Sequence, residues 1–483
     1  MNYDSPKFLL NDVLKATAGN LVTGASEKTF YGISTDSRLV KKGNLFIALK
    51  GEKFDGHDFV NQALQQGAAG IIVHDAKVGK DLADKNATVI KVADTLIALG
   101  DLAHEWRKRF SLTVIGLTGS SGKTTTKEMI AAIIGRKKNI LKTEGNLNNL
   151  IGLPQTIFRL TAEHELAILE MGTNTRGEIK RLTQIALPDI GLITNVGPAH
   201  LAGFGSIAVV REEKGDLFFN MSPSGTIIVN IDDKAVTICA ERWTGRKITF
   251  SMSPNADITV KDIKMNGIKG MSFNLIVGEN TQKVEMKIVG LHHVNNAMSA
   301  AAAAFAVGTD IKTIAEGLME FRPFSGRMEM VKLRNGSFLL DDSYNANPAS
   351  VREALMTLKD LKVHHNGYVF LGDMLELGTE SEEMHRKIGM LIATIGINAL
   401  FLQGNFSRVT AAGAMEGGLS PENIFFLSNE NNGINYLKEN LKKGDWILVK
   451  GSRGMKMEKI VVQICENFGS DNINGHNKTI NRE

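Results

Sequence analysis

The chain has 483 residues, 43% of them hydrophobic and 22% charged, and its formal net charge at pH 7 is +4. At about 100 to 200 residues per domain, this length predicts roughly two to four domains, each able to bury a core. Lys and Arg are scattered, no apolar run approaches the ~18 residues of a membrane helix, and no signal-peptide pattern opens the chain. We therefore expect a cytoplasmic, monomeric protein without nucleic-acid partners or membrane spans.

The first block, residues 1–110, is predicted to be a small α/β domain. The strand-like segment GNLFIALKG (43–51) precedes a helix and a strand within 58–74. A helical stretch over 96–110 then leads into the next block.

The second block, residues 111–322, alternates apolar strands with helices. Its strand-like runs are LTVIGLT (112–118), ELAILEMG (165–172), DIGLITNV (189–196) and GTIIVN (225–230). Continuous apolar runs of this kind are typical of parallel strands that are covered on both faces. We therefore expect a central domain with a parallel sheet.

The segment GLTGSSGKTTTKEMI (116–130) joins the first of these strands to a helix. A glycine-rich turn between a strand and a helix points backbone N–H groups at an anion, as in nucleotide-binding loops. Lys123 would then reach the terminal phosphates, and the Thr124 hydroxyl would ligate Mg²⁺. The common pattern has a glycine where this chain has Leu117, so the segment predicts a variant phosphate loop rather than a plain turn.

Three further residues of this block are candidates for the same site. Glu170 ends a strand, at the sheet edge where phosphate and metal lie in open α/β folds, and could ligate Mg²⁺. His200 follows the next strand, and Lys214 stands in a helix-like stretch after it. Taken alone, Glu170 could be a solvated carboxylate, a single histidine is more often structural, and a lysine in REEKGD is more often solvated.

The third block, residues 323–467, repeats the alternation. Its strand-like runs are SFLLDDS (337–343), GYVFLGD (367–373), NALFLQG (398–404), NIFFLS (423–428) and DWILVKG (445–451). Helices are predicted over 348–361 and 457–468, so the block indicates a second, Rossmann-like sheet. Residues 468–483 are polar and are predicted to form a disordered tail.

A series of short motifs runs through the chain. They are GLTGSSGKTTT (116–126), TEGNLNNLIGLP (143–154), EMG (170–172), ITNVGPAHL (193–201), EEKGDLF (212–218), FRPFSGRMEM (321–330), DDSYNANP (341–348), LGDMLELG (371–378) and KGSRGMKMEK (450–459). Together, and in this order, they resemble the Mur ligase family, the ATP-dependent enzymes that build the peptide of bacterial peptidoglycan. The resemblance runs from about residue 32 to 467, and the family's own phosphate-loop pattern, G-x-T-G-[ST]-x-G-K-[ST], accommodates Leu117.

This resemblance implies an α/β fold of three domains. They would be a small N-terminal α/β substrate domain (1–110), a central P-loop ATPase-like domain with a parallel sheet (111–322) and a C-terminal Rossmann-like ligase domain (323–467). It also implies an ATP- and Mg²⁺-dependent ligase whose partners are a UDP-N-acetylmuramoyl tripeptide and D-alanyl-D-alanine. ATP would phosphorylate the tripeptide carboxylate, a poor electrophile, and the amine would attack the acyl phosphate. The third residue of the tripeptide, diaminopimelate or lysine, stays open.

The resemblance also implies the site residues. The ATP contacts would be Gly119, Ser120, Ser121, Gly122, Lys123, Thr124, Thr125, Asn296, Arg327 and Asp342, and the metal ligands Thr124, Glu170, His200 and Lys214, with Lys123, His200 and Lys214 catalytic. The substrates would contact Ser37 and Arg38 in STDSR (34–38), Asn146, Asn149, Tyr344, Asn345, Asn347 and Arg453. Lys214 is expected as an N-carbamate, because an ammonium would repel the metal whereas a carbamate offers an anionic oxygen. One departure is His293, where the family usually has Asn.

Three other functions share part of this pattern. A sister ligase that adds diaminopimelate usually carries Asp-Asn-Pro-Arg in its third domain, a string that is absent from this sequence. A folylpolyglutamate synthase begins close to its phosphate loop, whereas about 110 residues precede this one. A nucleotide switch would lack an acceptor domain, and no Asn-Lys-x-Asp guanine motif follows the loop.

Overall fold

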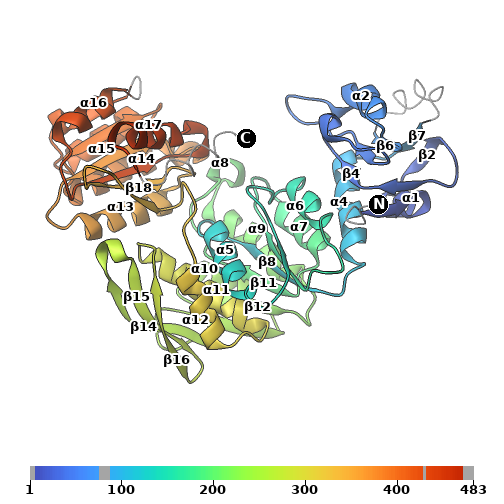
Figure 1. Cartoon of the computed structure of the whole chain (residues 1–483), viewed down its shortest axis with the longest axis horizontal. Coiled ribbons are helices and arrows are strands. Elements are labelled where there is room, and N and C mark those ends of the chain that lie inside the picture. The colour runs from blue at the N-terminus through green and yellow to red at the C-terminus, as the bar shows by residue number, and fades with distance from the viewer. Residues whose placement is uncertain (1–5, 75–86, 428–430, 471–483) are drawn as a thin grey trace.

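The computed structural model describes residues 6–74, 87–427 and 431–470. Within these ranges the chain forms three α/β units, each built on its own sheet. Figure 1 shows them in chain order, from the N-terminal unit at the upper right through the central unit to the C-terminal unit at the upper left. The predicted α/β fold of several mostly parallel sheets is confirmed.

The N-terminal unit has a five-stranded sheet that is parallel except for its first strand. The order is β2 (Asn20–Thr23), β7 (Thr88–Lys91), β6 (Gly70–Val73), β5 (Leu45–Ile47) and β4 (Ile33–Ser34), and β1 (Lys7–Leu9) pairs separately with β3 (Thr29–Tyr31). Its helices are α1 (Leu10–Thr17), α2 (Val60–Gln65) and α4 (Thr95–Arg107). The side chain of Asp94 caps α4 by accepting from the backbone N–H groups of Leu96 and Ile97.

Helix α4 packs the N-terminal unit against the central unit. Its buried residues Leu99 and Leu102 belong to the same apolar cluster as Leu182 and Ile185 of the central unit. Because that cluster is continuous, the N-terminal unit is packed against the central one and not merely tethered to it.

The central unit is built on a nine-stranded sheet. Its order is β16 (Asn280–Met286), β15 (Met271–Val277), β14 (Ile258–Met265), β13 (Arg246–Phe250), β12 (Thr226–Asn230), β11 (Ile190–Ile193), β8 (Thr113–Thr118), β10 (Leu166–Glu170) and β9 (Ile140–Lys142). Its helices are α5 (Lys123–Ile134), α6 (Gly152–Ile157), α7 (Glu178–Ala186), α8 (Leu201–Phe204), α9 (Ile207–Phe219), α10 (Lys234–Ala240), α11 (His292–Ala306) and α12 (Ile311–Glu320).

The strands pair in parallel at one end of this sheet and antiparallel at the other. The strands from β9 to β14 pair in parallel, and the four apolar runs predicted from the sequence are β8, β10, β11 and β12. Strands β14 to β16 form an antiparallel meander that the sequence did not predict. Exposed polar residues interrupt β14 and β16, so these two strands lack the continuous apolar runs of the other strands, whereas β15 between them is mostly buried.

The C-terminal unit has a six-stranded sheet that is parallel except for its first strand. Its order is β17 (Glu329–Lys332), β18 (Phe338–Asp342), β22 (Trp446–Lys450), β19 (Gly367–Gly372), β20 (Ala399–Gln403) and β21 (Ile424–Phe426). Its helices are α13 (Pro348–Lys362), α14 (Ser381–Thr394), α15 (Ser407–Glu416), α16 (Asn431–Asn440) and α17 (Glu458–Phe468). Of the predicted tail, Phe468 closes α17 and Ser470 pairs with Leu333, while 471–483 lie outside the described residues.

Candidate active site

A cavity of about 410 Å³ is lined by the central and C-terminal units together. Seventeen of the predicted site residues line it: Ser120, Ser121, Gly122, Lys123, Thr124, Thr125, Asn146, Asn149, Glu170, His200, Asn296, Arg327, Asp342, Tyr344, Asn345, Asn347 and Arg453. Gly119, Lys214, Ser37 and Arg38 do not line it. The structure therefore brings together most of the residues that the sequence assigned to ATP, metal and the amine substrate.

The phosphate loop lies between β8 and α5 and is held from the side by the end of β11. Asn195 accepts hydrogen bonds from the backbone N–H of Ser121 at 2.9 Å and, through its own backbone oxygen, from Ser120 N–H at 3.0 Å. The Ser120 hydroxyl donates to the Gly197 oxygen at 3.0 Å. These bonds fix the loop so that the start of α5, whose first N–H groups have no acceptor within the helix, borders the cavity, as an anion site requires.

Gly122 is the residue before α5, and its backbone is left-handed, with φ +77°. A Cβ there would lie 2.3 Å from Oδ1 of the buried Asn296. Gly122→Ala is therefore expected to weaken ADP binding at least tenfold and to lower the free energy of unfolding by about 1–2 kcal/mol. Titration calorimetry with ADP and denaturant unfolding would measure both effects.

Gly177 provides the matched control, because its φ is +88° and no atom lies within 4 Å of a Cβ built there. Gly177→Ala should show the backbone strain without the loss of ADP affinity. Equal ADP affinity in the two variants would mean that the contact between Gly122 and Asn296 does not shape the nucleotide site.

The Lys123 ammonium folds back on its own loop and donates to the Gly119 oxygen at 2.6 Å. Burial lowers the pKa of Lys123, Glu170 opposes that shift, and the nearby Arg327 adds to it. A cation in this setting lacks a fully compensating anion among the described residues, and a nucleotide phosphate would supply one.

Glu170 ends β10 with its carboxylate almost fully buried, 2% exposed. Its Oε1 accepts from Asn148 Nδ2 at 2.8 Å and from the Thr124 hydroxyl at 3.3 Å. Its Oε2 lies 3.7 Å from the Lys127 ammonium and accepts no hydrogen bond from the described residues. A buried carboxylate oxygen without a hydrogen bond, next to a hydroxyl, fits a hard divalent cation such as Mg²⁺.

Lys214 is 2% exposed on α9, so the alternative of a solvated helix residue is wrong. Its neighbour Glu213 is equally buried and accepts from the N–H groups of Gly177 and Ile179 at the start of α7. Burial lowers the pKa of Lys214 well below its usual value, and the charge of Lys123 lowers it further. A lysine amine that is neutral near pH 7 is the form that can add carbon dioxide.

His200 lines the cavity with its ring in contact with the C-terminal unit. Its Nδ1 lies 2.5 Å from Oε2 of Glu376, which belongs to the segment after β19. This hydrogen bond lowers the pKa of Glu376, so its carboxylate is ionised near neutral pH. Among the described residues, no group of three or more His, Cys, Asp and Glu side chains could hold a metal by itself. A metal here would also need Thr124, a modified Lys214 or phosphate oxygens.

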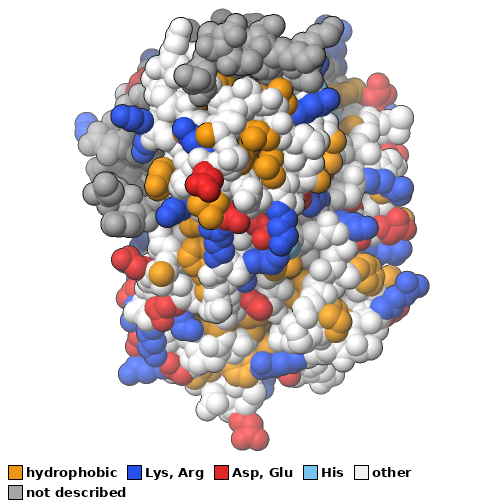
Figure 2. All heavy atoms as spheres, turned by 90° about the vertical axis from the view of Figure 1, so that its right-hand side faces the viewer, with side chains coloured by type: hydrophobic (Ala, Val, Ile, Leu, Met, Phe, Trp, Pro, Cys, Tyr) orange, Lys and Arg blue, Asp and Glu red, His pale blue; other side chains and the backbone are white. Residues whose placement is uncertain are grey.

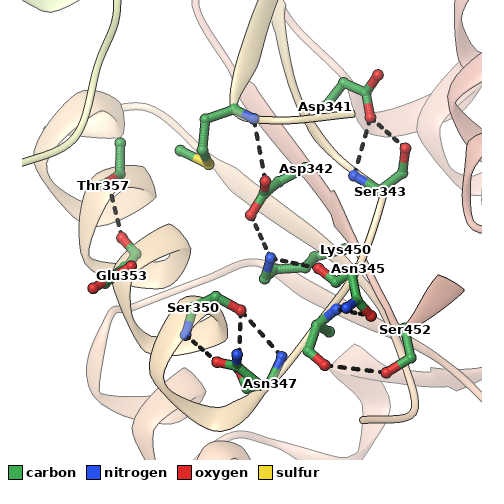
Figure 3. Close-up of polar contacts among 12 residues, drawn as sticks. Asp341, Asp342, Ser343, Asn345, Asn347, Ser350, Glu353, Thr357, Lys450 and Ser452 are labelled. Atoms are coloured by element: carbon green, nitrogen blue, oxygen red, sulfur yellow. Dashed lines mark hydrogen bonds and ion pairs between the residues drawn. The ribbon is translucent and has the colours of Figure 1, made fainter. Parts of the chain in front are cut away.

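The C-terminal unit contributes a polar network at the ends of β18 and β22 (Figure 3). The Lys450 ammonium donates to Oδ2 of Asp342 at 2.5 Å and to the Asn345 oxygen at 3.0 Å. Burial raises the pKa of Asp342, and Lys450 opposes that shift. The Tyr344 ring lies under two guanidinium groups, with Arg327 at 4.2 Å and Arg453 at 5.3 Å from its centre.

Asn347 connects this network to the phosphate loop. Its side chain caps α13 by accepting from the Ser350 N–H at 2.9 Å, and its Nδ2 donates to the Ser120 oxygen at 3.4 Å. Asn149, in contrast, uses its side chain in the turn before α6, where it accepts from the N–H groups of Ile151 and Gly152. A residue that the sequence assigned to the substrate therefore contacts the phosphate loop across the two units.

The histidine that departs from the family pattern is buried beside this loop. Asn296 Nδ2 donates to Nδ1 of His293 at 3.3 Å, and the Thr126 hydroxyl donates to Asn296 Oδ1 at 3.5 Å. Burial lowers the pKa of His293 far below its usual value and that of His292 to about 3, so both rings are neutral. His293 thus takes part in holding Asn296 at the phosphate-loop end of the cavity.

The predicted UDP-side residues lie elsewhere, in the N-terminal unit. The Ser37 hydroxyl donates to Gln62, and the side chain of Arg38 is 79% exposed and paired with Asp36 at 2.6 Å. Figure 2 looks at this side of the molecule and shows acidic and basic side chains intermixed across it. Among the described residues, no helix is long and apolar enough to cross a membrane.

Sequence reasoning missed several residues around the site. Asn148 and Lys127 hold Glu170, Lys450 holds Asp342, and Glu376 holds His200. Asn148, Lys450 and Glu376 lie inside the short motifs of the series, and Lys127 lies inside the segment 116–130, so position in a motif was the available signal. The structure was needed to show which partner each one contacts.

Comparison with known proteins gives three matching family models. They are the Mur ligase family, catalytic domain (29–107), the Mur ligase middle domain (117–304) and the Mur ligase, glutamate ligase domain (326–453). A UDP-N-acetylmuramoyl-tripeptide–D-alanyl-D-alanine ligase of Bacillus subtilis (strain 168) is 35% identical over 95% of this chain and 99% of that protein. A crystal structure of MurF from Acinetobacter baumannii is 30% identical, with TM-score 0.87, and covers 96% of this chain and 100% of that one. The MurF ligase of Thermotoga maritima in complex with ADP is 26% identical, with TM-score 0.80, over 90% of this chain and 97% of that one.

Proposed function

The chain belongs to the Mur ligase family, and from this membership we propose that it joins D-alanyl-D-alanine to a UDP-N-acetylmuramoyl tripeptide. It is an ATP-dependent ligase of peptidoglycan precursor synthesis. The observation that carries the proposal is the cavity shared by the central and C-terminal units, where Asn347 of the C-terminal unit contacts Ser120 of the phosphate loop. In that arrangement a nucleotide phosphate and an incoming amine can meet.

The first step is transfer of the terminal phosphoryl group of ATP to the tripeptide carboxylate. A carboxylate oxygen forms the new bond to phosphorus, and the bond to ADP breaks. Negative charge gathers around the phosphoryl group, and the Lys123 ammonium and the N–H groups at the start of α5 would stabilise it. Arg327, which lines the same cavity, would add a second cation.

In the second step the amine of D-alanyl-D-alanine attacks the acyl phosphate. The new C–N bond forms, the C–O bond to phosphate breaks, and the proton that the amine loses passes to the departing phosphate. We assign the dipeptide to Tyr344, Asn345, Asn347 and Arg453, where amide groups and a guanidinium can bind a carboxylate and backbone polar groups.

Thr124 and Glu170 would hold one Mg²⁺ ion, and His200 with Lys214 as a carbamate would hold a second. When bound, these ions neutralise charge on the transferring phosphoryl group. Carbamate formation joins the neutral Lys214 amine to carbon dioxide and releases one proton, so no further reactant is needed.

The UDP end of the substrate is assigned to the N-terminal unit. Arg38 would exchange Asp36 for the diphosphate, since its guanidinium is exposed and suits a bidentate anion. We place the domain boundaries near residues 110 and 322, and we propose a cytoplasmic location, where a UDP-linked precursor and ATP occur together.

If an acyl phosphate forms, one oxygen atom of the tripeptide carboxylate must end up in the released phosphate. When the tripeptide carboxylate carries a heavy-oxygen label, one labelled oxygen should appear in the released phosphate during the complete reaction. Mass spectrometry of the phosphate measures this transfer. Phosphate that carries no label would exclude an acyl phosphate intermediate.

The dependence of phosphate release on each substrate distinguishes the proposed ligase from a nucleotide switch. Phosphate release is measured with ATP and with a diaminopimelate or a lysine tripeptide, each with and without D-alanyl-D-alanine. Release that needs both a tripeptide and the dipeptide supports the proposed ligase and identifies the third residue. Release that needs neither would indicate a nucleotide switch instead.

A further inference from the structure

We infer that Glu376 is a positioning residue that orients the His200 ring from the C-terminal unit, so that its Nε2 is the nitrogen left to bind a metal. The inference rests on the proposed role of His200 as a metal ligand. Glu376 was not among the residues assigned from the sequence, and its carboxylate does not line the cavity.

The hydrogen bond between the two side chains fixes the tautomer. His200 Nδ1 and Glu376 Oε2 are 2.5 Å apart, the geometry of a hydrogen bond from the ring nitrogen to a carboxylate oxygen. In the neutral ring that bond keeps the hydrogen on Nδ1 and leaves the lone pair on Nε2. Carboxylates that accept from a metal-binding histidine are a recurrent way to set both the ring orientation and its basicity.

The backbone holds the two residues against each other as well. The backbone N–H of Ala202 donates to the backbone carbonyl oxygen of Glu376 at 3.0 Å. A Cβ built at Gly378 would lie 3.2 Å from the Ala202 backbone, so the two chain segments are in close contact. His200 and Glu376 are both non-glycine residues with left-handed backbones, at φ +55° and +64°. Such conformations persist only where the surrounding structure enforces them, and they gather at functional sites.

The contact also crosses between two units of the protein. His200 precedes α8 of the central unit, while Glu376 follows β19 of the C-terminal unit. Close by, Leu201 and Phe204 of α8 share a small apolar cluster with Met384 of α14. The hydrogen bond that orients the His200 ring therefore depends on the packing of the C-terminal unit against the central one, which couples that packing to the proposed metal site.

Three variants test this coupling. Glu376→Ala removes the acceptor, Glu376→Gln keeps an amide oxygen that can still accept from Nδ1–H, and Glu380→Gln removes an exposed carboxylate from the same segment as a control. The first readout is the tautomer of His200, from nuclear magnetic resonance of labelled ring nitrogens without nucleotide or metal. The second is the affinity of the ADP-bound protein for Mn²⁺, used as the probe ion.

We expect the Nδ1–H tautomer in the wild type, in Glu376→Gln and in the control, and a mixture of tautomers in Glu376→Ala. Mn²⁺ binding should weaken about tenfold in Glu376→Ala and little in Glu376→Gln. In a double-mutant cycle, adding Glu376→Ala to His200→Ala should weaken Mn²⁺ binding no further.

Two results would overturn the inference. The first is a wild-type tautomer and a wild-type Mn²⁺ affinity in Glu376→Ala; if His200→Ala still weakens Mn²⁺ binding, the proposed metal role of His200 stands without it. The second is a wild-type Mn²⁺ affinity in His200→Ala, which would remove that metal role and the inference with it.

Discussion

Replacing Lys123 with alanine is expected to slow amide ligation by at least about 100-fold while the protein stays folded. The Lys123 ammonium lies at the start of α5, where in the proposed reaction the charge of the transferred phosphoryl group would develop. Loss of one such preorganised group typically raises the activation barrier by about 3 kcal/mol. The measurement is the rate of phosphate release with ATP, tripeptide and dipeptide.

The same substitution should not destabilise the protein. Burial lowers the pKa of Lys123 in the folded chain, so the folded state binds its proton less tightly than the unfolded chain does. The charged lysine therefore opposes folding at neutral pH, and this cost fades as the pH rises toward its unfolded-state pKa. The thermal midpoint of Lys123→Ala without ligands should equal or exceed that of the wild type.

Lys137→Ala is the matched control, since Lys137 lies beyond the other end of α5 and pairs with Asp310 on the surface. That variant should ligate at the wild-type rate. A folded Lys123→Ala protein with near-normal turnover would remove the loop lysine from the reaction.

Local sequence could predict the parts of the site that follow from short-range geometry. The apolar run before Gly119 and the Gly-Lys-Thr sequence after it specify a strand, a turn and a helix start, and the structure has β8, the loop and α5 there. Glu170 was likewise placed by its position at a strand end. In both cases the position of the functional side chain follows from its place at the end of a strand or the start of a helix.

Long-range contacts were outside the reach of local sequence. The pattern around Lys214 has the composition of a solvated helix face, yet Glu213 turns inward to hold the start of α7 and Lys214 is buried with it. Glu376 reaches His200 from a different unit, 176 positions away in sequence. Strands β14 and β16 were missed because exposed polar residues interrupt them, and the mostly buried β15 was missed with them.

Lys214→Ala is expected to lose most of the ligase activity, at least about 100-fold, because the carbamate would supply an anionic oxygen to the second Mg²⁺. Lys214 is buried, and its burial and the charge of Lys123 hold its pKa well below the usual value. That shift favours the neutral amine, which is the form that adds carbon dioxide. Rates are measured with each variant at saturating ATP and Mg²⁺.

Acetate or formate in excess should restore part of the activity of Lys214→Ala by filling the vacated anionic place. Lys214→Arg should not respond, because a permanent cation would still repel the metal.

In the wild type, labelled bicarbonate should give a carbamate resonance that is missing from Lys214→Ala, and this signal does not depend on turnover. Lys180→Ala, on a different helix, controls for the loss of a lysine and should keep both the resonance and the rate. Wild-type activity in Lys214→Ala, or a wild type without the carbamate signal, would mean that the buried lysine is structural and that the second metal finds its ligands elsewhere.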